Sequence, residues 1–147
     1  RSRGTVRLAS ADPAAAPLID PNYWEDPRDR EMSIKGLKLA REIMAQAPLR
    51  PFILAERLPG PDVRTDRDYF DFACRHAKTD HHPAGTCRMG SDPAAVVDPR
   101  LRFNGIAGLR VVDASIMPTV VSSNTNAPTI MIAEKAADMI KADHGAR

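Results

Sequence analysis

The alternation of apolar and polar positions predicts a short strand at the start of the chain. Within residues 4–10, Val6 and Leu8 alternate with Thr5 and Arg7, and this period of two is typical of a strand. The following residues, 12–22, are rich in proline and predict an ordered loop. The chain therefore begins with a strand and a loop.

Two amphipathic helices are predicted next. Asp26 and Pro27 are suited to an N-cap and a first helical position, and apolar residues then recur at helical spacing up to Pro48. Residues 65–68, of sequence TDRD, resemble a capping box and predict the start of a second helix. We expect the aromatic residues of this helix to face the core: Tyr69, Phe70 and Phe72.

The character of the chain changes near His81. Short apolar runs at residues 96–97 and 109–113 predict two strands, which indicates a piece of sheet. A closing helix is expected to begin near Pro128 and to run toward Lys141, with Asn126 well placed to cap it.

Composition narrows the class of protein. With 43% hydrophobic and 27% charged residues among 147, the chain can build one soluble globular core. The net charge of +2 is dispersed, which argues against a nucleic-acid partner. No apolar run approaches the roughly 20 residues of a membrane span. Two cysteines make no disulfide framework, so reduced thiols and a cytoplasmic location are favoured, although the location stays open because a targeting signal can precede the chain.

Two unusual stretches suggest a split active site: residues 81–90 (HHPAGTCRMG) and residues 122–129 (SSNTNAPT). The first resembles the histidine loop of the glucose-methanol-choline (GMC) flavoenzymes, and the second resembles the loop that carries their other catalytic residue onto the last helix. The segments 2–23 and 109–119 are also similar to that family, in the same order. The chain is identified as resembling its C-terminal region, and choline dehydrogenase-like members most closely.

The resemblance implies an α/β fold that is part of a larger flavoenzyme. Residues 1–78 are expected to be an α+β piece of the substrate-binding domain, and residues 79–147 the returning segment of a Rossmann-like FAD-binding domain. No G-x-G-x-x-G turn occurs in the chain, so the missing N-terminal FAD-binding portion or subunit is an expected partner. A homo-oligomer could also cover the apolar faces. The resemblance thus predicts a fragment or one chain of a split protein.

His82 and Asn124 are the catalytic candidates. Oxidation of an alcohol removes the hydroxyl proton as a hydride leaves carbon, and an imidazole can accept a proton near neutral pH. The resemblance places His82 at the family's histidine and Asn124 at its histidine-or-asparagine position. An amide cannot act as the base, so Asn124 is expected to orient the alcohol oxygen and stabilise its developing charge.

Further residues are expected at the cofactor. The resemblance places Asp113 and Ala114 near the ribityl and phosphate part of FAD, and Thr125, Asn126 and Pro128 at the start of the closing helix. The unpaired N–H groups and the positive dipole end of that helix suit the negative charge of a reduced flavin pyrimidine. An ordinary turn at Asp113 and an ordinary helix end are the alternatives.

The sequence therefore predicts part of an FAD-dependent oxidoreductase that oxidises a primary alcohol to an aldehyde by hydride transfer to flavin N5. The alternative is a non-catalytic module or subunit that completes a separate FAD-binding chain. His76, His81, His82 and Cys87 lack the spacing of a zinc site, so no metal is expected. His81 is assigned no function.

Overall fold

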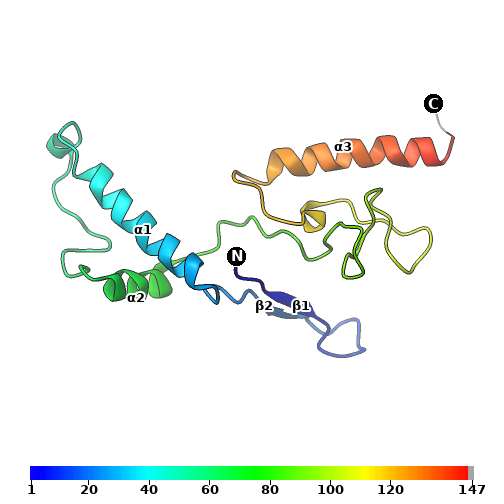
Figure 1. Ribbon diagram of the computed structural model, residues 1–147, viewed down its shortest axis with the longest axis horizontal. Helices are drawn as coiled ribbons and strands as arrows, with labels where there is room; N and C mark the ends of the chain where they lie inside the picture. The colour runs from blue at the N-terminus through cyan, green and yellow to red at the C-terminus, as the bar shows by residue number, and fades with distance from the viewer. Residues whose placement is uncertain (146–147) are drawn as a thin grey trace. The chain divides into compact units, whose positions relative to one another are not determined.

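The computed structural model describes residues 1–145 and divides into two compact units, Arg1–Lys78 and Thr79–Arg147. Among the described residues, the first unit contains two strands, two α-helices and a short 3-10 helix, and the second contains a short 3-10 helix and an α-helix. Figure 1 shows this last helix beside irregular chain. The division falls at the predicted domain boundary. The assignment of the units to a substrate-binding and an FAD-binding domain stays a prediction.

The first unit begins with an antiparallel hairpin of β1 (Thr5–Arg7) and β2 (Leu18–Asp20), in which Val6 pairs with Ile19. The predicted first strand is therefore confirmed. β2 lies within residues 12–22, which the proline content predicted to be loop throughout, and that prediction is wrong for these three residues. The prolines flank the strand, so its N–H groups remain free to pair.

Helix α1 (Pro27–Met44) begins as predicted. The Asp26 carboxylate accepts a hydrogen bond from the Arg28 amide at 2.8 Å, which satisfies one of the free N–H groups of the first turn. The helix ends at Met44 rather than at Pro48. A proline disfavours helical geometry in the residue before it, and the chain turns instead into the short 3-10 helix η1 (Arg50–Phe52).

Helix α2 (Asp66–His76) also begins as predicted, with a complete capping box between Thr65 and Asp68. Tyr69 and Phe72 are buried, whereas Phe70 is only partly buried and packs edge-on against the indole of Trp24. The expectation for the aromatic residues is thus confirmed for two of the three.

Helices α1 and α2 lie side by side (Figure 1). Arg41 of α1 connects the two helices and the loop between them. The Arg41 guanidinium makes two hydrogen bonds of 2.6 Å to Glu56 and one of 2.7 Å to the Tyr69 hydroxyl. The hydrogen bonds from Arg41 lower the pKa of the Glu56 carboxyl. Such a paired fork of charge-assisted bonds fixes geometry as well as contributing energy.

The second unit contains isolated bridges in place of the two predicted strands. Val97 bridges to Met89 and to Phe103, and Arg102 bridges to Arg110, but no consecutive pairs extend these contacts. The prediction of regular strands at residues 96–97 and 109–113 is wrong. Turns interrupt the chain after one or two residues each time, so a short apolar run cannot build a ladder.

Helix α3 (Asn126–Asp143) covers this irregular chain. It begins two residues before the predicted start. Its buried residues join a core with the bridged segments and the short 3-10 helix η2 (Ala114–Ile116): Val97, Leu101, Ile116, Met117, Ile132 and Ala136. Within residues 1–145, no helix is both long and apolar enough to cross a membrane.

Candidate active site

The histidine loop turns sharply at Gly85. Its backbone has a φ of +89°, which side-chain-bearing residues rarely adopt. A Cβ at this position would also lie 3.2 Å from the Met117 carbonyl oxygen, closer than most real contacts. Glycine therefore allows the chain to pass close to Met117 just after His82.

Two backbone hydrogen bonds fix the rest of this loop to η2. The Cys87 amide donates to the Ser115 carbonyl at 3.0 Å, and the Met89 amide donates to the Ile116 carbonyl at 2.8 Å. Ile116 is buried in the core. The histidine loop is thus anchored to the hydrophobic core rather than held only by its own turn.

His82 and Asn124 lie in direct contact. The Asn124 Nδ2 is 2.8 Å from His82 Nε2, and the imidazole is partly buried while the asparagine is exposed. The geometry brings together the two residues that were predicted as catalytic. An imidazole beside an amide donor at a half-open position can bind a hydroxyl group and take its proton.

Thr125 contacts the other side of the same imidazole. Its Oγ1 lies 2.9 Å from His82 Nδ1, and its amide nitrogen lies 3.5 Å from the same atom, at the outer limit of a hydrogen bond. The threonine is only 8% exposed. The sequence predicted Thr125 as a cofactor residue and missed this contact, because nothing in a single threonine indicates which way its hydroxyl turns.

The start of α3 differs from the prediction. Thr125 already has helical backbone angles (φ −79°, ψ −8°) and is the N-cap, so Asn126 is the first helical residue and Pro128 the third. The expectation that Asn126 caps the helix is wrong for this reason. The first turn has neither a side-chain cap nor an acidic residue. The positive end of the helix is therefore left without a neutralising group from this turn.

Asp113 forms a local turn. Its Oδ1 accepts hydrogen bonds from the amide and the hydroxyl of Ser115, and it is the N-cap of η2, which begins at Ala114. The carboxylate is exposed. These contacts match the alternative role of an aspartate that begins a turn, and contact of Asp113 or Ala114 with a cofactor stays a prediction.

An ion pair closes the turn that follows the histidine loop. Arg88 makes two hydrogen bonds to the Asp92 carboxylate, at 2.7 and 2.8 Å. The hydrogen bonds from Arg88 lower the pKa of Asp92 to about 2. Gly90 lies beneath this pair, where a Cβ would be 2.9 Å from Asp92 Oδ2. The pair thus holds the chain in place directly after the loop that carries His82.

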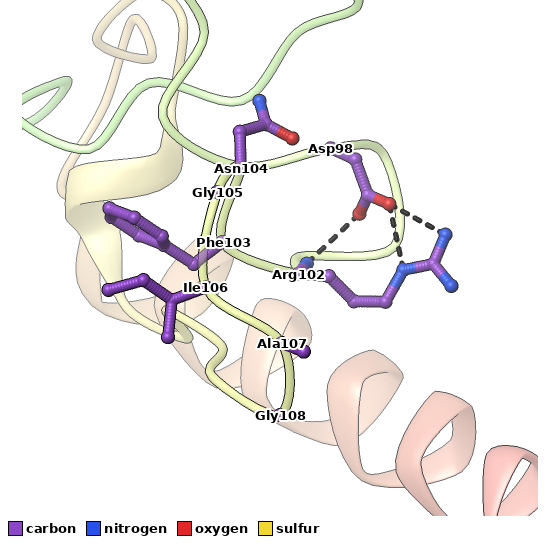
Figure 2. Close-up of a pocket in the computed structure, with 8 residues that line it drawn as sticks. All are labelled: Asp98, Arg102, Phe103, Asn104, Gly105, Ile106, Ala107 and Gly108. Carbon is purple, nitrogen blue, oxygen red and sulfur yellow. Dashed lines mark hydrogen bonds and ion pairs between the residues drawn. The ribbon is translucent and has the colours of Figure 1, made fainter.

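A shallow pocket of about 380 Å³ lies elsewhere, along a surface loop that runs from Asp98 to Gly108 (Figure 2). Asp98 accepts from the Arg102 amide at 2.9 Å and from its guanidinium at 2.8 Å, so its charge is already paired. Neither His82 nor Asn124 lines this pocket. Among the residues that the structure describes, no three histidine, cysteine or acidic side chains are grouped as metal ligands.

Comparison with known proteins identifies relatives of this chain. The family model of the GMC oxidoreductases matches residues 1–133. The chain is 51% identical over 140 residues to an alcohol dehydrogenase [acceptor] of Pseudomonas putida and 51% identical over 142 residues to the mitochondrial choline dehydrogenase of Homo sapiens. Each match covers 95% of this chain, and 25% and 24% of the relative. An FAD-dependent oxidoreductase from Chaetomium thermophilum superposes with a TM-score of 0.89 at 30% identity, over 98% of this chain and 25% of that one.

The chain belongs to the GMC oxidoreductase family and corresponds to the C-terminal region of its larger flavoenzymes. The predicted family and the α/β class are confirmed, and so is the likeness to choline and alcohol dehydrogenases. The chain spans about a quarter of the length of the curated relatives it matches. By name, these relatives are an alcohol dehydrogenase, a choline dehydrogenase and an FAD-dependent oxidoreductase.

Proposed function

We propose that this chain supplies the catalytic pair of an FAD-dependent enzyme that oxidises a primary alcohol to an aldehyde. The contact of 2.8 Å between His82 Nε2 and Asn124 Nδ2 carries the proposal. The alcohol loses two electrons and one hydrogen as hydride from carbon, and its hydroxyl proton goes to His82. FAD, when bound, supplies the hydride acceptor at N5.

Asn124 holds the alcohol oxygen. Without substrate its amide donates to the imidazole, and an alcohol oxygen that enters beside Nε2 takes over this donor. The same N–H then stabilises the negative charge that develops on oxygen while the proton moves to His82. The division of roles follows from chemistry, since the amide has no basic nitrogen.

The start of α3 fits the electron-rich edge of the cofactor. The first turn has free N–H groups at Asn126 and Ala127, no acidic side chain and no side-chain cap, so its positive dipole end suits an anionic group. We place Thr125, Asn126 and Pro128 beside the flavin on this basis. Asp113 and Ala114 are placed near the ribityl and phosphate part.

The relatives support a primary alcohol as the substrate class. One acts by name on alcohols and another on choline, which carries a primary hydroxyl group. Which alcohol is oxidised depends on pocket residues in the part of the enzyme that this chain does not include.

The alternative role, a subunit that completes an FAD-binding chain without catalysing, has one observation in its favour. Several large apolar side chains near the site are exposed, as expected of a surface that another polypeptide covers: Val120, Val121, Ile130 and Met131. The same surface serves the catalytic proposal, in which the N-terminal FAD-binding portion is the partner. His82 distinguishes the two roles.

Anaerobic bleaching of the flavin by simple primary alcohols tests the proposal. The chain is joined to its FAD-binding complement, and His82→Ala is compared with His144→Ala, an exposed histidine near the end of α3. Loss of a general base predicts a decrease of about 10²- to 10⁴-fold in the bleaching rate for His82→Ala alone. An unchanged rate in His82→Ala, with FAD still bound, would leave only the subunit role.

A further inference from the structure

Thr125 has a role that the family match does not assign. We infer that Thr125 is a positioning residue for His82: its hydroxyl oxygen accepts a hydrogen bond from Nδ1–H of the imidazole, which leaves Nε2 unprotonated beside Asn124. The inference rests on the proposed function, in which Nε2 takes the substrate proton. It adds a third residue to the predicted catalytic pair.

The first support is that the Thr125 hydroxyl is not used by the helix. Threonine is a favoured N-cap residue because its hydroxyl can accept from the N–H groups of the first turn. Thr125 is the N-cap of α3, yet its side chain makes no cap bond. Its helical ψ of −8°, instead of the usual extended value, turns the hydroxyl away from the first turn. The hydroxyl meets His82 Nδ1 at 2.9 Å instead.

The second support is the environment of this hydroxyl. Thr125 is 8% exposed and, apart from the Tyr69 phenol, is the one buried polar side chain among residues 1–145. A buried hydroxyl without a partner is costly, so the bond to His82 satisfies Thr125 as well as the histidine. A surface threonine would exchange this bond for water, whereas a buried one holds the ring in a single orientation.

The tautomer follows from the two neighbours taken together. A neutral imidazole carries one ring proton, so one nitrogen donates and the other accepts. Asn124 Nδ2 is a donor and faces Nε2, which must then be the accepting nitrogen. The ring proton is therefore on Nδ1, and Nδ1–H donates a hydrogen bond to Thr125 Oγ1. The Thr125 amide, at 3.5 Å, is too far to compete strongly for the same atom.

The backbone of Thr125 keeps the hydroxyl in place. The Thr125 carbonyl accepts from the Thr129 amide at 3.0 Å and from the Thr129 hydroxyl at 2.7 Å, one turn further along α3. The helix therefore fixes the position of Thr125, and Thr125 fixes the ring. The Thr125 side chain therefore connects α3 to the imidazole of His82.

Nitrogen NMR of the histidine ring tests the inference directly. The chain, joined to its FAD-binding complement and labelled with ¹⁵N in its four histidines, gives the protonation of each ring nitrogen, and His82 is assigned by its loss in His82→Ala. The variants are Thr125→Val, which removes the hydroxyl but keeps the branched shape, and Thr125→Ser, which keeps the hydroxyl. Thr119→Val is the control, because it makes the same chemical change at an exposed position that contacts neither His82 nor Thr125.

The wild-type protein, Thr125→Ser and Thr119→Val are expected to show a protonated Nδ1 and an unprotonated Nε2. Thr125→Val is expected to shift the ring toward protonated Nε2 and to slow flavin reduction by about 2- to 10-fold, the factor of one ordinary hydrogen bond, without weakening alcohol binding. A wild-type ring protonated at Nε2, or a Thr125→Val ring identical to wild type, would overturn the inference. His82→Ala with undiminished bleaching would instead overturn the proposed function and leave the NMR result standing.

Discussion

His82 and Asn124 are 42 residues apart in the chain, and the Asn124 amide nitrogen lies 2.8 Å from His82 Nε2. The contact forms because η2 anchors the histidine loop while the asparagine loop leads directly into α3, and both η2 and α3 pack in one core. The proposed catalytic pair comes from two loops, and its contact thus depends on the hydrophobic core that η2 and α3 share.

Removal of the Asn124 amide is expected to slow the chemical step. In Asn124→Ala the developing charge on the alcohol oxygen loses its donor, which in comparable sites costs about 10²- to 10³-fold in rate. The measurement is the rate of anaerobic flavin bleaching at saturating alcohol. Ser123→Ala, an exposed neighbour in the same loop, serves as the control, and equal rates in the two variants would contradict the role given to Asn124.

Gly85→Ala is expected to destabilise the second unit. Alanine there adopts a left-handed φ, at a cost of about 1–2 kcal/mol, and its Cβ also approaches the Met117 carbonyl to 3.2 Å. Gly105→Ala is the matched control, because Gly105 has a φ of +106° but no atom within 4 Å of the added Cβ. Urea unfolding gives both free energies. A loss in Gly85→Ala no larger than that in Gly105→Ala would show that the close approach to Met117 has no cost.

The Arg88–Asp92 pair is expected to stabilise the protein in a defined pH window. The pKa of Asp92 falls from 3.8 to about 2 on folding, so its contribution is complete above pH 3.8 and is lost as the pH falls toward about 2. The urea midpoints of wild type and Asp92→Asn should differ above this window and converge within it. Asp138→Asn, at an exposed position on α3, is the control. A difference between the two urea midpoints that persisted at pH 2 would contradict the stabilising role given to the Arg88–Asp92 pair.

Trypsin is expected to separate the two units at Lys78. This residue is exposed and lies outside any helix or strand, at the boundary between the units. Limited digestion, read by mass spectrometry, should yield a cut after residue 78 before cuts within α1 or α3, and Lys78→Ala should delay it. Early cleavage inside α1 would show that the boundary is not the most accessible segment.

Capping residues in the sequence predicted where helices α1 and α2 begin. Asp26 and the Thr65–Asp68 capping box act through contacts a few residues away, so their effect can be predicted from short stretches. The partnership of His82 with Asn124 came from the family resemblance, and the geometry agrees with it. Periodicity could not predict the isolated bridges of Val97, because a lone bridging residue has no repeat for a pattern to detect.

The contact of Thr125 with His82 was not predicted from the sequence, for a different reason. It depends on the backbone angle of a single residue at the entrance to α3, which decides whether the hydroxyl faces the helix or the imidazole. Because Thr125 is the N-cap, Asn126 is the first helical residue instead of the cap. Both differences between sequence and structure thus lie at the entrance to α3.

The continuity of α3 with the asparagine loop links remote positions to the catalytic rate. Asn124 and Thr125 share an unbroken backbone with a helix whose Ile132 and Ala136 are buried and whose Ile130 and Met131 are exposed. A slide of α3 by the rise of one residue, about 1.5 Å, would displace Asn124 and Thr125 by about half the length of their contacts with His82. A substitution at buried Ile132 that shifts the position of α3 is therefore expected to change turnover, although the side chains of His82, Asn124 and Thr125 are unchanged.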